Sequence, residues 1–196
     1  MNAPSITVAI LAGGASTRLG GRDKGLESLL DRPLVAWAAD AWNAQDIALV
    51  VVANRNIDDY AMSCAFHASA VAQGFRGPLA GIAAALAACT TPLLLTVPVD
   101  CPDPPPDLRE RLSASLHDSV AAVAYDGERR QPLFALYRRD AADSAANAVL
   151  TGQGVWQWQD AIGAREVDFS DQRRKFHNLN TPEDFAEYAD DLRTRD

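Results

Sequence analysis

The chain has 196 residues, of which 48% are hydrophobic and 22% charged, and its formal net charge is −8. This length allows one domain with a well-buried core, and the composition is that of an ordinary soluble globular protein. The acidic balance argues against non-specific nucleic-acid binding, and no apolar run is long enough to cross a bilayer.

Apolar runs alternate with helical patterns along the first half of the chain. Strands are predicted at Ile6–Leu11, Ala48–Val52, Leu93–Val99 and, more weakly, Ser69–Ala72. Helices are predicted at Pro33–Asn43, Leu79–Cys89 and Pro106–Leu116, while residues 56–67 fit a short helix and a connection. This alternation predicts a parallel sheet with helices on both faces.

The second half of the chain is less regular. The strands predicted there are Val120–Tyr125, Leu133–Tyr137, Arg165–Phe169 and Phe176–Leu179, and the helices are Arg139–Leu150 and Val155–Ile162. Thr181 and Pro182, followed by two acidic residues, form the start pattern of a last helix that runs to about Leu192. Since neither a repeat nor a linker divides the sequence, we expect one domain over residues 1–196, an α/β sandwich of three layers with a mostly parallel central sheet.

The three cysteines, Cys64, Cys89 and Cys101, are widely spaced and form no C-x-x-C pair. Such spacing predicts neither a zinc site nor a disulfide framework, and it fits a reducing compartment. The N-terminal residues lack the basic start of a signal peptide. We therefore expect a cytoplasmic protein without a membrane contact.

A glycine-rich loop follows the first predicted strand, and from Leu11 to Gly25 it reads LAGGASTRLGGRDKG. Glycines at a strand end let the backbone approach a ligand closely, and their N–H groups can hold phosphates. Arg18, Arg22 and Lys24 add cations to this loop, and Lys24 is one of only two lysines in the chain. Neither a Walker A loop nor a G-x-G-x-x-G fingerprint fits the spacing, so the sequence indicates a phosphate site of another kind.

Asp100 comes directly after the most apolar predicted strand, at the sheet edge where open α/β sheets bind their ligands. A carboxylate there suits Mg²⁺, although an aspartate that only caps the next turn is the alternative. Asn54 and Arg55 follow another strand and reach the same edge. The stretch from Gly77 to Gly81, GPLAG, opens a helix whose N-terminus can face an anion, or it is an ordinary helix start.

Two asparagines near the C-terminus, Asn178 and Asn180, lie in the sequence HNLNTPED. Their amides both donate and accept hydrogen bonds, which suits a polar heterocycle. Asn180 can instead serve, with Thr181, as a plain helix cap.

The pattern LAGG-x-x-x-R-x-G-G-x-D-K-G resembles the signature loop of nucleotidyltransferases built on a Rossmann-like sheet, and its ending looks most like that of the molybdenum cofactor guanylyltransferase family. The VPVDCP stretch around Asp100, the GPLAG stretch and the N-x-N-T-P stretch resemble further motifs of that family, in the same order. The resemblance extends from Ile6 to about Tyr188. Val52 and Gln73 depart from it, because the family commonly has an asparagine and an aspartate there.

The resemblance implies that GMP is transferred from GTP to the terminal phosphate of molybdenum-molybdopterin, with Mg²⁺ as cofactor and pyrophosphate as the second product. It implies catalytic roles for Arg18, Lys24 and Asp100, with Asp100 as the metal ligand. The nucleotide contacts that it implies are Leu11, Ala12, Gly13, Gly14, Lys24, Asn54, Gly77, Pro78, Leu79 and Asp100. The contacts that it implies with the pterin-bearing substrate are Gly21, Asp23, Asn178 and Asn180.

Three questions stay open at this point. Asp23 either supports the second substrate or orients Lys24. The chain is either this guanylyltransferase or another nucleotidyltransferase, for cytidylyl transfer to the same acceptor or for a sugar phosphate. A non-catalytic module that binds nucleotide is the remaining alternative, and transient contact with molybdoenzymes or cofactor carriers is expected of the enzyme.

Overall fold

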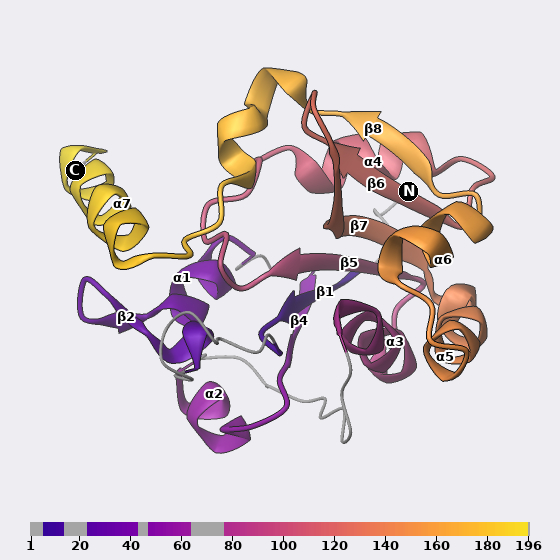
Figure 1. The fold of residues 1–196 in the computed structure, drawn as a ribbon, viewed down its shortest axis with the longest axis horizontal. Helices are drawn as coiled ribbons and strands as arrows, with labels where there is room; N and C mark the ends of the chain where they lie inside the picture. The colour runs from indigo at the N-terminus through magenta and orange to yellow at the C-terminus, as the bar shows by residue number, and fades with distance from the viewer. Residues whose placement is uncertain (1–5, 14–22, 43–46, 64–76, 196) are drawn as a thin grey trace.

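The computed structural model describes residues 6–13, 23–42, 47–63 and 77–195 (Figure 1). Within these residues six strands form one sheet in the order β4-β1-β5-β7-β6-β8. They are β1 (Ile6–Leu11), β4 (Ile47–Val52), β5 (Leu93–Pro98), β6 (Ala121–Tyr125), β7 (Arg130–Arg138) and β8 (Arg165–Asp168). Of the six, β7 alone runs against its neighbours, so the predicted mostly parallel sheet is confirmed.

Helices cover both faces of this sheet. They are α1 (Leu34–Asp40), α2 (Ile57–Ser63), α3 (Pro78–Ala88), α4 (Leu108–Leu116), α5 (Ala142–Leu150), α6 (Val155–Ala161) and α7 (Pro182–Arg195), and the 3₁₀ helices are η2 (Lys24–Leu26), η3 (Arg139–Ala141) and η4 (Ser170–Phe176). Alternate side chains of β1 point to opposite faces, with Ile6, Val8 and Ile10 in one core beside α1 and α4. Ala9 lies in a second core, beside α3, α5 and α6. The predicted three layers are confirmed.

A small hairpin of β2 (Ser28–Leu29) and β3 (Arg32–Pro33) lies outside the main sheet. Leu29 of this hairpin and Leu34 of α1 form a third apolar cluster with Leu179 and with Ala189 of α7. Figure 1 shows α7 beside this hairpin, away from the sheet. The cluster thereby brings the segment before α7 back to the N-terminal part of the chain.

The predicted strand Phe176–Leu179 is wrong. Phe176 ends η4, and its ring packs edge-on against Phe134 and Phe169, with centroids 4.9 and 5.7 Å away. The apolar spacing that indicated a strand therefore belongs to a short helix and an irregular segment. The last helix extends to Arg195, beyond the expected Leu192.

The predicted strand Ser69–Ala72 lies outside the described residues, as do Gln73 and Cys64. Residues 57–63 of the ambiguous stretch form α2. Among the described helices, none has the length and apolar character that a membrane crossing requires.

Candidate active site

The carboxyl ends of three parallel strands meet at one edge of the sheet, where Leu11 of β1 lies between Val52 of β4 and Pro98 of β5. Described residues at these strand ends, together with Asp23, the start of α3 and Leu133, line a cavity of about 590 Å³. Its lining includes eight predicted site residues, namely Leu11, Ala12, Gly13, Asp23, Asn54, Gly77, Pro78 and Asp100. The sheet edge at which the sequence predicted ligand binding thus contains a cavity of the size that small molecules occupy.

Other predicted residues lie elsewhere. Leu79 is buried in the second core, where it packs with α3 and its neighbours and does not line the cavity. Gly14, Arg18 and Gly21 lie outside the described residues. Gly77 has a φ of +81°, which explains a glycine at the turn that opens α3.

Lys24 does not itself line this cavity, but it joins Asp100, which does, to a distant part of the chain. Its Nζ atom lies 2.8 Å from Asp100 Oδ2 and donates a second hydrogen bond of 2.7 Å to Asn180 Oδ1. The Lys24 and Asp100 side chains are only 15% and 19% exposed. Three residues predicted as functional from three separate motifs therefore form one cluster, with the ammonium partly shielded from water.

The second carboxylate oxygen of Asp100, Oδ1, is buried and has no hydrogen-bond partner within the described residues. Leaving a buried acceptor unpaired is costly, so such an atom is typical of a position that a ligand completes. A hard divalent cation such as Mg²⁺ fits a single carboxylate oxygen, because it takes its remaining ligands from phosphates and water. No group of three His, Cys, Asp or Glu side chains suited to a metal is found among the described residues.

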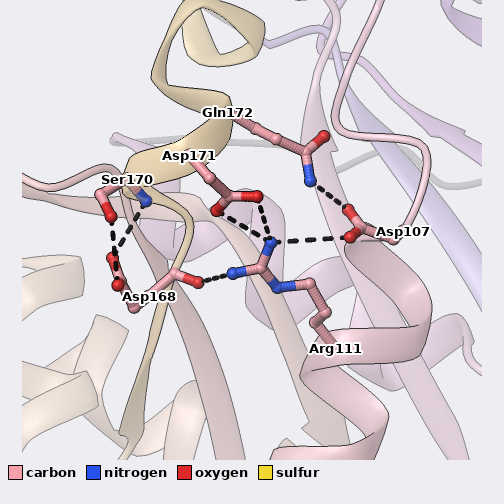
Figure 2. Close-up of polar contacts among 6 residues, drawn as sticks. All are labelled: Asp107, Arg111, Asp168, Ser170, Asp171 and Gln172. Carbon is pink, nitrogen blue, oxygen red and sulfur yellow. Dashed lines mark hydrogen bonds and ion pairs between the residues drawn. The ribbon is translucent and has the colours of Figure 1, made fainter.

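The segment that carries the two asparagines is anchored at its start by Arg111 of α4 (Figure 2). Arg111 Nη1 donates to both carboxylate oxygens of Asp171, at 3.0 and 3.1 Å, and lies 3.5 Å from Asp107 Oδ2. Arg111 Nη2 donates to the carbonyl oxygen of Asp168, and Gln172 Nε2 donates to Asp107 at 2.7 Å. These contacts fix η4 against the N-terminal end of α4.

The end of the same segment is anchored to the loop after β5. Lys175 Nζ lies 2.6 Å from Asp103 Oδ2, and Cys101 Sγ donates to the carbonyl oxygen of Lys175 at 3.0 Å. Burial, together with the charges of Asp100 and Asp103, raises the pKa of the Cys101 thiol, so it stays protonated and acts as a donor. The N–H of Leu179 donates to the Asp100 carbonyl at 2.8 Å, which places both asparagines beside Asp100.

A second cavity of about 1030 Å³ is lined in part by the residues that follow Asp100. Cys101–Asp103, the β6–β7 hairpin, η4, residues 177 and 179, and α7 line it. Asp100 lines the first cavity and Cys101 lines the second, so the cluster around Lys24 and Asp100 lies close to both.

Thr181 caps α7, as the sequence predicted, and Asp184 in the first turn completes a reciprocal capping box with it. Asp184 Oδ2 accepts hydrogen bonds from the N–H groups of Asn180 and Thr181, at 2.7 and 2.8 Å, while Thr181 Oγ1 accepts from the Asp184 N–H at 3.2 Å. Partial burial raises the pKa of the Asp184 carboxyl, but the hydrogen bonds from the Asn180 and Thr181 N–H groups outweigh it and bring this pKa below its ordinary value. These hydrogen bonds therefore fix the backbone of Asn180 and stabilise the ionised form of the Asp184 carboxyl.

We expect Asp184→Ala to lower the free energy of unfolding at pH 7 by about 1 kcal/mol, the usual cost of a lost cap. Since the folded pKa is lowered, this contribution is complete above the unfolded value of about 3.9 and is lost as the pH falls through the folded value. Urea unfolding at pH 7 and at about pH 3 measures it. Asp190→Ala, which breaks an exposed pair with Arg193 on the same helix, is the control. An Asp184→Ala effect that persists unchanged in acid contradicts the assignment.

Gly25 lies against the ring of Tyr60, which is 1% exposed. A Cβ atom at Gly25 would lie 2.9 Å from Tyr60 Cε1 and closer still to its hydroxyl oxygen. We expect Gly25→Ala to destabilise the protein by about 1–3 kcal/mol, because the buried ring cannot move aside freely. Thermal unfolding beside Gly154→Ala, where a Cβ meets nothing within 4 Å, tests this. Equal melting temperatures for the two variants contradict it.

Several residues at the site were not predicted. Val52, Gly81, Pro98 and Leu133 also line the first cavity, and Asn56 and Tyr60 contact Asp23. Asn56 directly follows the two residues that were considered at the end of β4, and Tyr60 lies four positions further, one helical turn away. This spacing was the available signal, but it does not reveal that the helix faces the glycine-rich loop.

Residues 8–167 match the family described as the MobA-like NTP transferase domain. The molybdenum cofactor guanylyltransferase of Serratia proteamaculans is 39% identical over 91% of this chain and 91% of that protein. That of Shewanella amazonensis is 39% identical over 91% of this chain and 92% of that protein. The molybdopterin-guanine dinucleotide biosynthesis protein A of Archaeoglobus fulgidus has the same fold, with a TM-score of 0.74, 23% identity, and coverage of 97% of this chain and 100% of that one.

Proposed function

The chain belongs to the family of MobA-like NTP transferase domains, and we propose that it transfers GMP from GTP to the terminal phosphate of molybdenum-molybdopterin. The observation that carries this proposal is the meeting of Lys24, Asp100 and Asn180 beside a cavity at the carboxyl edge of the sheet. Both named guanylyltransferases are similar to the chain over about nine-tenths of its length. The three residues that meet come from three of the motifs on which the family resemblance was based.

The proposed reaction needs positioning and charge stabilisation more than a strong base. An oxygen of the acceptor's terminal phosphate attacks the α-phosphorus of GTP, the bond from that phosphorus to the β-phosphate oxygen breaks, and pyrophosphate leaves. The acceptor phosphate is already ionised near neutral pH, so alignment dominates. Backbone around Gly13 holds the triphosphate, and the Lys24 ammonium stabilises the charge on the transferred phosphate. Arg18 and Gly14, outside the described residues, remain proposed partners in this step.

Asp100 is the proposed metal ligand, through the buried oxygen that has no hydrogen-bond partner among the described residues. When held by this oxygen, Mg²⁺ would supply charge neutralisation to the phosphates of the nucleotide. Lys24 contacts the other oxygen of the same carboxylate, so the two roles of Asp100 use different atoms.

The acceptor is proposed to approach from the second cavity, with its phosphate directed to the Lys24 cluster. Asn178 and Asn180 line neither cavity, but they flank Leu179, which lines the second cavity and donates its N–H to the Asp100 carbonyl. The Asn178 Oδ1 atom is buried without a hydrogen-bond partner in the described part of the chain. An unpaired amide oxygen of this kind suits a donor of the pterin ring. Gly21 lies outside the described residues.

The experiment that tests this function is calorimetric titration of the pure protein with GTP, CTP and ATP, each with Mg²⁺, repeated with Asp100→Ala. Selective GTP binding that weakens in the variant supports the guanylyl assignment and the metal ligand. A preference for CTP assigns the chain to cytidylyl transfer, and Val52, an apolar side chain in the cavity wall, makes this comparison necessary. Binding without turnover in the presence of the acceptor indicates a non-catalytic module.

Three expectations from the sequence complete the proposal. The protein acts in the cytoplasm as one domain, and it contacts molybdoenzymes or cofactor carriers transiently to pass on its product. Fractionation of cells tests the location and a pull-down with a molybdoenzyme tests the contact, both separately from the nucleotide titration.

A further inference from the structure

The segment that follows β4 holds both ends of the glycine-rich loop. At the start of the loop, Asn54 Nδ2 donates to the Gly13 carbonyl at 3.2 Å. At its end, Asn56 Nδ2 donates to Asp23 Oδ2 at 3.0 Å, and the Tyr60 hydroxyl donates to Asp23 Oδ1. One short stretch of chain therefore contacts a residue near each end of the loop, Gly13 and Asp23.

Asp23 is engaged through both carboxylate oxygens. Besides the bonds from Asn56 and Tyr60, Arg55 Nε lies 3.4 Å from Asp23 Oδ2, and the Asp23 side chain is only 8% exposed. The donors to this buried carboxylate are all side chains of the protein, and they fix its position. Its chemistry is that of an anchor more than of a contact for a second substrate.

The anchor acts on the residue next to it. The Asp23 carbonyl accepts from the Leu26 N–H at 3.0 Å, and the Lys24 carbonyl accepts from the Glu27 N–H at 3.2 Å, so a 3₁₀ turn begins at once. Because the turn is tight, the direction in which the Lys24 side chain leaves the backbone depends on where Asp23 is held.

A second observation points the same way. Tyr60 is buried against Gly25, where a Cβ atom would lie 2.9 Å from Tyr60 Cε1, so the ring fits closely to the backbone just after Lys24. The left-handed backbone of Asn56, with φ at +55°, turns the chain between β4 and α2, and asparagine tolerates this conformation well. Tyr60 of α2 thereby contacts the residues on both sides of Lys24, Asp23 and Gly25.

We propose that Tyr60 and Asn56 are positioning residues, which hold Asp23 so that Lys24 reaches Asp100 and Asn180. This proposal rests on the proposed function for its kinetic consequence. Of the two roles that the sequence left open for Asp23, it assigns the orientation of Lys24.

The first test is kinetic and uses Tyr60→Phe, which removes only the hydroxyl. We expect kcat to fall roughly tenfold, as for the loss of a hydrogen bond to a charged group, while the KM for GTP changes less than about twofold. Asp23→Asn should lower kcat similarly, and adding Tyr60→Phe to it should cost little more, because both changes break the same contact. Ser63→Ala, which removes a hydroxyl from the same helix away from Asp23, is the control and keeps the wild-type kcat.

The second test needs no activity. The chain has two lysines, so protein labelled with ¹³C at lysine Cε gives one NMR signal from Lys24 and one from Lys175, which pairs with Asp103. Tyr60→Phe should move the Lys24 signal and leave the Lys175 signal in place, whereas Ser63→Ala should move neither.

Both results are required. An active wild type whose Tyr60→Phe variant keeps its kcat, or keeps the Lys24 signal unmoved, overturns the proposal. If the wild type transfers no nucleotide, the proposed function fails, and the NMR measurement alone then decides whether Tyr60 positions Lys24.

Discussion

Lys24→Ala is expected to lower the kcat of guanylyl transfer at least ~100-fold, the loss seen when one preorganised charge contact is removed from a transition state. The Lys24 ammonium is largely shielded, at 15% exposure, and it bridges Asp100 and Asn180, so another cation cannot easily replace it. Turnover of the purified variant with saturating GTP and acceptor measures the effect.

The control for this variant is Arg193→Ala, which removes one cation from an exposed ion pair on α7. It changes the net charge by the same amount and should keep the wild-type rate. Near-full activity of Lys24→Ala would remove Lys24 from the mechanism. A slow Lys24→Ala with an unchanged melting temperature would locate the loss in the chemical step.

Asp100→Asn is the second change with a large expected effect, again at least ~100-fold in kcat. The amide keeps the size of the side chain but loses the charge that pairs with Lys24 and the anionic oxygen proposed to hold Mg²⁺. The dependence of the rate on Mg²⁺ concentration separates these two losses. If Asp100 holds the metal, the variant needs far more Mg²⁺ for half-maximal rate.

A variant that is slow but has the wild-type Mg²⁺ requirement would restrict Asp100 to the orientation of Lys24. Asp40→Ala serves as the control, because Asp40, the last residue of α1, makes an exposed ion pair with Arg32. It should change neither the rate nor the Mg²⁺ requirement.

The six strands of the main sheet and most of the helices could be predicted from residue patterns, because buried strands need continuous apolar runs and covering helices need apolar stripes. β1 has the predicted bounds Ile6–Leu11, and α4 ends at the predicted Leu116. The sequence also placed the glycine-rich loop and Asp100 at one edge, since parallel strands end on the same side.

The β2–β3 hairpin was not predicted from the sequence, because its turn lacks the usual turn residues. The β2–β3 hairpin turns at Leu30 and Asp31, with φ of +48° and +60°, without the glycine or asparagine that usually marks such a turn. The cluster of Leu29 and Leu34 with Leu179 stabilises the hairpin from outside, so its stability does not depend on the turn residues alone.

Which side chains meet at the site could not be predicted from residue patterns, because distant segments come together only through tertiary packing. Lys24 and Asn180 are 156 positions apart, and no periodicity links them. They meet because Leu179 and Ala189 are buried against the β2–β3 hairpin, while η4 is anchored on α4 and the Asp100 loop. The sequence specifies the chemistry of each loop, but contacts between distant loops follow from how the apolar faces beneath them close together.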